Sequence, residues 1–563
     1  MKFMKRTDSL NVLMLGVFAG CAGNSFPASS GAFPAVSGPE RRAAPNVLFI
    51  IADDLNDSIQ GMGGHPQTLT PNITRFMQSA VWFSNAQCNA PLCGPSRASL
   101  LTGLYPHTLG YYGWGQNPAG QKNHKETFQR PVIKDCTTFI QEFAQNGYTV
   151  FGTGKITHEY HRDAWLFDNA DGKRRYAFSP VTQGPGASDG LVMSNGLLRG
   201  VKAPEYTPAP LAKEGRYFGP LSRVPDVPPN PKTGAPGYRG WMEWGQPFRY
   251  ESETDRDLMA DEKSARFAVD VLKQKHEQPF LLAVGFCRPH EPLVCPQKYF
   301  DLFKDVQIEL PPYLENDLAD CAKALYGNSV GEKIFEALKE SGPGMWQEWM
   351  RAYLACVAFM DDQFGQIIRT LDSSPYATNT IVIFTGDNGF HMGEKNMINK
   401  MTLWNESTRV PFLIRVPGMQ TGGQNCFRPV SLIDIYPTLT DYCGMPVPKQ
   451  GLDGHSLRPF IKNPQSGHWT GPDVALTVWM GPPTAAQRAD CSVPANKELQ
   501  NFSAVSDRYR YIRAYTGEEE FYDHSADPNE WHNLAGNPEY KTVLEEMKFR
   551  MDQLLSSGTQ KTQ

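Results

Sequence analysis

Two pairs of adjacent residues in the sequence offer only oxygen ligands. Asp53 and Asp54 follow one apolar run, and Asp387 and Asn388 follow another run far along the chain. Carboxylate and amide oxygens without histidine or cysteine select a hard cation, Ca²⁺ or Mg²⁺. One acidic pair after a strand is more often a turn or a helix cap, but two such pairs together predict a metal site.

The stretch CGPSRASLLTG, residues 93–103, places a thiol four residues before an arginine. Pro95 suits the first turn of a helix, and Gly103 suits its end. Such a helix brings Cys93 and Arg97 to one face, and its N-terminus favours anions and lowers the pKa of a thiol. The stretch predicts an anion site that contains a reactive group, although a buried structural cysteine on a capped helix fits it as well.

Basic side chains complete the candidate site. Each of them alone is more often a solvated or structural residue, but around one cation and one reactive residue they describe a site for a tetrahedral oxyanion ester. Positive groups stabilise charge on the non-bridging oxygens, and an acid protonates the leaving oxygen. The members of this set are Arg97, Lys155, His158, His290 and Lys400.

Four apolar runs would position these groups, at residues 46–54, 148–158, 279–290 and 380–389. Continuous apolar runs are typical of strands buried on both faces of a parallel sheet, and ligands bind beyond the carboxyl ends of such strands. Amphipathic helical patterns occupy 135–147, 262–276 and 350–371. This alternation predicts an α/β fold with a large, mostly parallel sheet flanked by helices.

Two segments depart from the alternation. Residues 160–260 are rich in Gly, Pro, Trp and Tyr, and we expect them to be insertion loops over the substrate face. Residues 503–515 alternate like a half-exposed antiparallel strand, residues 519–536 suggest a strand, a turn and a short helical piece, and residues 540–555 suggest a last helix. We predict a catalytic domain at 46–465 and a smaller C-terminal α+β subdomain with an antiparallel sheet at 466–563.

Composition limits the classes of function. The 563 residues are 40% hydrophobic and 20% charged, which predicts a globular core, and a net charge of −5 gives no indication of a nucleic-acid partner. Eleven cysteines show no paired metal-type spacing, so the sequence indicates neither a zinc module nor a disulfide framework.

The N-terminus is typical of an export signal. MKFMKR is basic, and LNVLMLGVFAG is apolar but too short to span a bilayer. We expect a signal peptide over 1–21 and a flexible tether over 22–45. Because FAGC resembles a bacterial lipobox, Cys21 would carry a lipid, and the protein would lie in the periplasm or on the cell surface of a bacterium with no other membrane contact.

Six segments of the sequence resemble the type I sulfatases. CGPSRASLLTG matches the C-x-P-S-R signature of that family, and GKITH resembles its second signature. NVLFIIADDLND and GDNGFHMGE are similar to its metal-binding segments, and FLLAVGFCRPHEP and STRVPFLIRVPG are similar to its iduronate-2-sulfatase-like members. The resemblance runs from about residue 46 to 535 and implies an alkaline-phosphatase-like fold.

The resemblance implies a chemistry that the residue types alone do not show. A maturation enzyme, formylglycine-generating or an anaerobic maturase, would convert Cys93 to Cα-formylglycine. The hydrated aldehyde would attack sulfur, the alcohol would leave, and the second hydroxyl would expel sulfate. Ca²⁺, in preference to Mg²⁺, would be held by residue 93 together with Asp53, Asp54, Asp387 and Asn388.

The resemblance also implies roles for the basic groups. Arg97 and Lys155 would stabilise the hydrated aldehyde, and His158 would assist the elimination. His290 and Lys400 would meet the sulfate and the leaving oxygen, with His290 as general acid. Asp387 would accept a proton from the nucleophile. The substrate-binding set would be Lys155, His290, Lys400 and His391.

The sequence therefore favours an exported sulfatase that acts on sulfated carbohydrate, either glycosaminoglycan or algal polysaccharide fragments. Asn388 stands where iduronate-2-sulfatases more often have histidine, and residues 160–260 show no clear match, so the sugar stays open. One alternative is a phosphatase or phosphonate hydrolase of the same superfamily, which usually has a Thr or Ser nucleophile and two zinc ions. Another is a sugar-binding lipoprotein without activity.

Overall fold

The four apolar runs form four neighbouring strands of a seven-stranded sheet. The computed structural model describes residues 44–113, 133–158, 160–177, 330–482 and 496–557, and also 208–326 except for 215, 217, 224–225, 227–228, 230–240 and 244–245. β1 (Asn46–Asp53) lies between β10 (Phe280–Pro289) and β12 (Thr380–Gly386), and β4 (Thr149–Gly154) pairs with β10. All three pairings are parallel, as the sequence predicts.

Three shorter strands complete the sheet on the side of β12. β15 (Phe412–Arg415) and β2 (Val81–Phe83) pair in antiparallel fashion, and β16 (Asn425–Cys426) is parallel to β2. The strand order is β16-β2-β15-β12-β1-β10-β4. The sheet is therefore mixed and mostly parallel.

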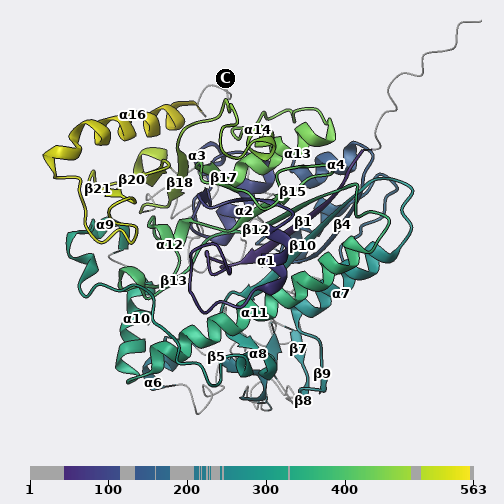
Figure 1. The fold of residues 1–563 in the computed structure, drawn as a ribbon, viewed down its shortest axis with the longest axis horizontal. Helices are drawn as coiled ribbons and strands as arrows, with labels where there is room; N and C mark the ends of the chain where they lie inside the picture. The colour runs from purple at the N-terminus through teal and green to yellow at the C-terminus, as the bar shows by residue number, and fades with distance from the viewer. Residues whose placement is uncertain are drawn as a thin grey trace, which may run out of the picture. The chain divides into compact units, whose positions relative to one another are not determined.

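Helices cover both faces of this sheet (Figure 1). Leu48 and Ile50 of β1 face α1 (Pro71–Met77), α7 (Ala260–Lys273) and α11 (Met345–Asp372), whereas Phe49 and Ile51 face α2 (Cys93–Thr102), α4 (Phe139–Gln145) and α13 (Ile435–Cys443). Each of the four side chains is at most 1% exposed, and each such burial contributes roughly 1.5–3 kcal/mol. None of the helices within the described residues is both long and apolar enough to cross a bilayer.

A second sheet, near the C-terminus, is antiparallel and follows chain order. Its strands are β18 (Ala475–Trp479), β19 (Asn501–Val505), β20 (Tyr509–Arg513) and β21 (Glu519–Asp523). α16 (Lys541–Ser557) packs on one face, and residues around Leu403 and Trp404 pack on the other. The predicted antiparallel C-terminal sheet is confirmed.

The sequence was misleading about details of this sheet. Residues 503–515 are not one strand, because a turn at 506–508 separates β19 from β20. The strands are not half-exposed either, because both faces of the sheet are covered. Arg510 and Glu520 are fully buried on the face that packs against Leu403 and Trp404. The segment 524–537 contains turns in place of the predicted helical piece, and a single 3₁₀ turn follows at Pro538–Tyr540.

The remaining elements are short. Residues 160–260 hold a 3₁₀ helix at Tyr160–Phe167, α6 (Ala209–Lys213) and β5 to β9 (Phe218–Pro220, Trp241–Glu243, Gln246–Phe248, Tyr250–Ser252, Asp255–Arg256). The others are β3 (Ala86–Gln87), α3 (Pro106–Leu109), β11 (Leu293–Cys295), α8 (Gln297–Asp301), α9 (Lys323–Tyr326), α10 (Val330–Glu340), β13 (His391–Met392), β14 (Ile398–Asn399), α12 (Asn405–Thr408), β17 (Val430–Ser431) and α14 (Arg458–Lys462). The predicted signal peptide and residues 22–43 of the tether lie outside the described residues, and the predicted domain boundaries stay predictions.

Two glycines let β4 and β10 approach closely where their site residues emerge. Gly154 has φ +76°, and a Cβ on it would lie 1.9 Å from the carbonyl oxygen of Gly285. A Cβ on Gly285 would lie 1.9 Å from the carbonyl oxygen of Lys155. Both contacts are with backbone, so neither strand can yield to a methyl group without moving Lys155.

We expect Gly285→Ala to destabilise the fold by roughly 1–3 kcal/mol, because it overpacks a backbone contact, and to lower activity by displacing Lys155. Denaturant unfolding and turnover of an aryl sulfate measure the two effects. Gly536→Ala is the matched control, since a Cβ there meets nothing within 4 Å. Equal stability of the two variants would contradict the close-approach argument.

Candidate active site

Asp53 and Asp54 occupy the carboxyl end of the central strand β1. The register between β1 and β10 shifts between Ala52 and Asp53, and Asp54 has φ +60°, in the left-handed region. Non-glycine residues adopt this conformation at a cost, and such residues often mark functional sites. Both carboxylates are buried, with at most 1% exposure.

The second oxygen-bearing pair meets the first one, as predicted. The backbone N–H groups of Asp54 and Asn388 both donate to Asp387 Oδ1, at 3.1 and 2.9 Å. Asn388 Nδ2 donates to Asp54 Oδ1 at 2.8 Å. Asp387 and Asn388 are completely buried. The ends of β1 and β12 therefore form one buried cluster of oxygens.

Helix α2 brings Cys93 and Arg97 into this cluster. Cys93 is its first residue, and Gly103 ends it with φ +71°, as the sequence predicts. Arg97 Nε donates to Asp387 Oδ2 at 2.8 Å, and its Nη2 lies 3.5 Å from Asp53 Oδ1. The guanidinium therefore binds acids contributed by two different strands.

The thiol of Cys93 does not behave as the helix N-terminus suggested. Burial, together with Asp53, raises its pKa to about 12 although Lys155 and Lys400 act in the opposite direction. The expected lowering of the thiol pKa is therefore wrong. An unmodified Cys93 stays a thiol at neutral pH, which is a poor nucleophile.

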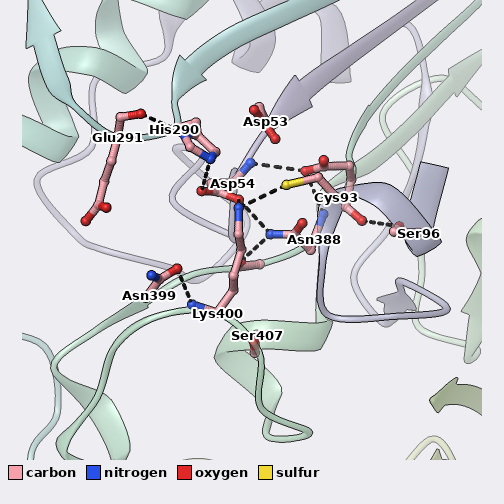
Figure 2. Close-up of polar contacts among 12 residues, drawn as sticks. Asp53, Asp54, Cys93, Ser96, His290, Glu291, Asn388, Asn399, Lys400 and Ser407 are labelled. Carbon is pink, nitrogen blue, oxygen red and sulfur yellow. Dashed lines mark hydrogen bonds and ion pairs between the residues drawn. The ribbon is translucent and has the colours of Figure 1, made fainter. Parts of the chain in front are cut away.

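Lys400 contacts both halves of the cluster (Figure 2). Its Nζ donates to Cys93 Sγ at 3.0 Å and pairs with Asp54 Oδ1. Burial opposes the charge on this amine, but Asp54 raises its pKa above the usual value, so Lys400 is protonated at neutral pH. It is placed to face a group that reacts at residue 93.

His290 lies on the other side of Asp54, with its Nε2 3.6 Å from Asp54 Oδ2. Its Nδ1 lies 2.6 Å from the carbonyl oxygen of Glu291, which can only accept, so Nδ1 carries a hydrogen. Burial and Lys400 lower the pKa of His290 to about 4, although Asp54 opposes them. In this free site the imidazole is neutral at pH 7, with Nε2 as an acceptor.

Lys155 and His158 approach from β4. Lys155 is almost fully buried and forms an ion pair with Asp53 Oδ2. Burial and Lys155 lower the pKa of His158 well below its usual value. His158 lies beside the start of α2, because a Cβ on Gly94 would be 3.7 Å from its Cγ.

His391 is not brought into this cluster. It is completely buried, and its Nε2 forms a hydrogen bond of 2.7 Å with Thr402 Oγ1. Its ring packs edge-on against Trp404, with centroids 6.3 Å apart. These contacts are structural, and the contact of His391 with substrate stays a prediction.

The residues fit a bound cation. Asp53 Oδ1 and Asn388 Oδ1 are buried acceptors with no hydrogen-bond partner, which is costly unless a ligand supplies one. Burial opposes ionisation of Asp53, but Lys155 and neighbouring cationic groups hold the pKa of that carboxyl well below its usual value, so it stays an anion. Potential ligand atoms of four side chains lie within 4.8 Å of one another, on Asp53, Asp54, Cys93 and His290.

Sequence reasoning missed two contributors to the site. The hydroxyl of Tyr353 of α11 donates to the carbonyl oxygen of Asp54 at 2.9 Å. This bond helps to hold Asp54 in its left-handed conformation. Glu291, beside His290 in Figure 2, is buried and forms an ion pair with Arg216 of the 160–260 segment. Glu291 stood within the FCRPHEP stretch, but nothing in its spacing indicated a partner in another segment.

Comparisons with known proteins agree with this site. A family model described as "Sulfatase" matches residues 45–445, and one described as "N-sulphoglucosamine sulphohydrolase, C-terminal" matches 393–557. A sulfatase from Formosa agariphila is 32% identical over 506 residues, covering 90% of this chain and 85% of the relative. An ulvan-active sulfatase from the same organism is 27% identical over 518 residues, covering 91% and 81%. The iduronate 2-sulfatase of Mus musculus is 25% identical over 448 residues, covering 74% and 71%.

Solved structures share the fold. A 2-O GAG sulfatase superposes with a TM-score of 0.61 at 20% identity, covering 92% of this chain and 93% of the other. A phosphonate monoester hydrolase of Agrobacterium radiobacter gives 0.64 at 21% identity, covering 91% and 96%. These likenesses confirm the alkaline-phosphatase-like fold. The family match, which spans most of the described residues and the whole cluster from Asp53 to Lys400, shows that the chain belongs to the sulfatase family and is a sulfuric ester hydrolase.

Proposed function

We propose that the chain is an exported sulfatase that hydrolyses sulfate esters of sulfated carbohydrates, with a formylglycine at position 93 and Ca²⁺ in the oxygen cluster. The observation that carries the proposal is the contact of residue 93 with a protonated side chain, Lys400, beside buried oxygens that lack hydrogen-bond partners. The site thus brings together three groups that hydrolysis of an oxyanion ester requires: a nucleophile, a metal cation and a cationic side chain.

Formylglycine would supply, once hydrated, the hydroxyl that attacks sulfur. Two features of this chain support it: Cys93 begins the C-x-P-S-R helix, and its buried thiol has a raised pKa that makes it unsuited to act itself. Arg97 would hold Asp387 in place beside it, and burial with Asp53 raises the pKa of Asp387 to about 6 against the effect of Arg97. Asp387 would accept the proton of the attacking hydroxyl.

Ca²⁺ would supply positive charge to the sulfate oxygens. Asp53, Asp54, Asp387 and Asn388 would hold it with the oxygen of residue 93, because oxygen-only sets suit hard cations. Lys155 would keep Asp53 ionised and oriented, and Lys400 and His290 would bind the ester from opposite sides of Asp54. These positive groups would also stabilise the negative charge of the transition state, and they would not have to move to do so because they are already in place.

Carbohydrate is the favoured substrate because two of the similar proteins act on polysaccharides, one on ulvan and one on GAG by their descriptions. A phosphonate hydrolase is the second candidate, since one neighbour of this fold is named for that activity. The N-terminal pattern of residues 1–21 supports export, and Cys21 would be the anchor.

Two assays test the function. We expect 4-nitrocatechol sulfate to be hydrolysed far faster than a phosphate monoester and a phosphonate monoester with matched leaving groups. A panel of defined sulfated oligosaccharides, read by mass spectrometry, then identifies the sugar and the sulfate position. Preference for the phosphonate would support the second candidate, and no turnover by fully matured protein would support a binding lipoprotein.

Asp53→Asn tests the metal. The change removes one negative charge from the cluster and one partner from Lys155 and Arg97, so we expect Ca²⁺ affinity to fall at least about 10-fold. Metal content and calorimetric titration measure this without reference to activity. Asp168→Asn, in an exposed ion pair with Arg174, is the control. Unchanged Ca²⁺ binding would contradict the assignment, and two zinc ions per chain would favour the phosphatase interpretation.

A further inference from the structure

The loop that delivers Lys400 has an unusual backbone. We define the Lys400 loop as residues 395–405. Four of its residues lie in the left-handed region without being glycine, with φ of 55°, 53°, 96° and 76°, namely Lys395, Asn396, Asn399 and Met401. Side-chain-bearing residues avoid this region, so the shape of the loop must be imposed by contacts outside it.

The catalytic part of the chain holds the N-terminal half of this loop. Ile398 and Asn399 pair with Met392 and His391 of β13, and Lys395 Nζ pairs with Asp317 Oδ1 at 2.8 Å. Met401 N donates to the carbonyl oxygen of Pro91 at 3.1 Å, and Thr402 Oγ1 bonds to His391 at 2.7 Å. Asn396 Nδ2 donates to the carbonyl oxygen of Leu314 at 3.2 Å. The carbonyl oxygens of Trp404 and Asn405 accept from Thr408 N and Arg409 N of the following chain at 3.2 and 2.8 Å, whereas other polar groups of residues 403–405 bond to the C-terminal part of the chain.

The C-terminal sheet and the turns that follow it supply the other partners. Glu530 Oε2 accepts from the N–H of Asn405 at 2.9 Å, and the carbonyl oxygen of Glu530 accepts from Lys395 Nζ. Arg510 Nη1 donates to the carbonyl oxygen of Leu403 at 2.9 Å, and its Nη2 donates to Asn405 Oδ1 at 3.1 Å. Arg510 of β20 and Glu530 of the turns after β21 thus together hold both ends of the loop.

Charge and burial make this arrangement rigid. Arg510 Nε and Glu530 Oε1 pair at 2.5 Å, with side chains at most 2% exposed. Glu520 Oε2 adds a bond of 2.8 Å from Trp404 Nε1. A buried pair whose other donors and acceptors are all satisfied has one favourable geometry, so it fixes position as well as contributing energy. We call Arg510, Glu520 and Glu530 the C-terminal clamp.

We propose that the C-terminal clamp is a positioning device that holds the Lys400 amine against the reacting group at residue 93, so that the C-terminal sheet is a working part of the active site. Its members are positioning residues, because they touch the Lys400 loop and not the reacting atoms. The inference rests on the proposed function in assuming that Lys400 acts on the sulfate ester.

A double-mutant cycle of Glu530→Gln with Lys400→Ala tests the clamp. Glutamine keeps the shape of the side chain but removes the charge that pairs with Arg510. We expect Glu530→Gln alone to lower kcat by ~10–100-fold, as misplacement of a catalytic group does, and to have little further effect in the Lys400→Ala background. A simple loss of folded protein would lower both backgrounds by the same factor, so additive losses would overturn the proposal.

Three comparisons keep the result interpretable. Arg510→Lys should reproduce the non-additivity, because lysine keeps the charge but cannot reach Leu403, Asn405 and Glu530 together. Arg513→Ala should leave turnover unchanged, because Arg513 lies on the same strand as Arg510 but forms a partly exposed ion pair with Asp552 of α16. Turnover of 4-nitrocatechol sulfate by the parent protein checks the proposed function separately, since an inactive parent contradicts that proposal, whereas an active parent with additive losses contradicts only the clamp.

Discussion

Replacing Cys93 with alanine will lower hydrolysis of sulfate esters by at least about 10⁴-fold and leave the fold intact. The loss is large because the nucleophile itself is removed, and the surrounding charges cannot replace it. The fold should survive because the change removes one small side chain from a helix whose other nine residues are also buried. Turnover of an aryl sulfate, with thermal unfolding measured in parallel, checks both statements.

The chemical state of residue 93 decides how this loss is explained. In active protein, mass spectrometry of the peptide that contains residues 93–103 should show the thiol sulfur replaced by an aldehyde oxygen. Cys88→Ala is the matched control, because Cys88 is equally buried and lies just before the helix. Full activity in a preparation whose Cys93 is still a thiol would contradict the formylglycine mechanism. The nucleophile would then be a thiol or a metal-bound water.

Local signals in the sequence were enough to predict the large sheet. The four apolar runs are buried on both faces, so almost every side chain in them is apolar, and their register brings their polar ends together. The helix at Cys93 could be predicted because Pro95 and Gly103 mark its first turn and its end. Asp53, Asp387 and Lys155 could be placed in one cluster because strand ends in a parallel sheet share an edge.

The C-terminal sheet and the turns after it were less predictable because their buried polar residues form hydrogen bonds with residues that are distant in the sequence. Arg510 and Glu530 look like solvated residues of an exposed strand and a turn. They are buried because the Lys400 loop supplies hydrogen-bond acceptors and donors that lie far away in the sequence. Arg510 is 107 residues from Leu403, and Glu530 is 125 residues from Asn405. Periodicity reports on burial but not on which distant group a charge will pair with.

The same limit applies to protonation at the site. A thiol at a helix N-terminus is expected to be acidic, yet complete burial beside Asp53 reverses the direction of the pKa shift for Cys93. His391 lies three residues after the predicted metal ligand Asn388, yet its ring forms a hydrogen bond with Thr402 and does not enter the site. Local motifs predict which residues gather, whereas the packing of the whole domain sets their charge state.

The proton donor to the leaving oxygen is the role most open to experiment. An alkoxide from a sugar needs protonation as its S–O bond breaks, whereas a nitrophenolate needs little help. If His290 is the general acid, His290→Ala should cost ~10²–10⁴-fold more with a sugar sulfate than with an aryl sulfate. Both constants, kcat and kcat/KM, should be measured on the two substrates across pH.

The structure sharpens what each outcome means. Burial and Lys400 lower the pKa of His290 to about 4 in the free site, so His290 as a general acid would have to gain its proton when the ester binds, whereas Lys400 is already protonated before binding. A required acid loses activity as pH rises through its pKa in the complex, so the alkaline limb of the sugar-sulfate profile should vanish in His290→Ala. Equal losses on both substrates would make His290 a sulfate ligand and assign the proton to Lys400. If Lys400 is the proton donor, Lys400→Ala should lower turnover of the sugar sulfate more than turnover of the aryl sulfate. If Lys400 only orients the ester, Lys400→Ala should lower turnover of both substrates by the same factor.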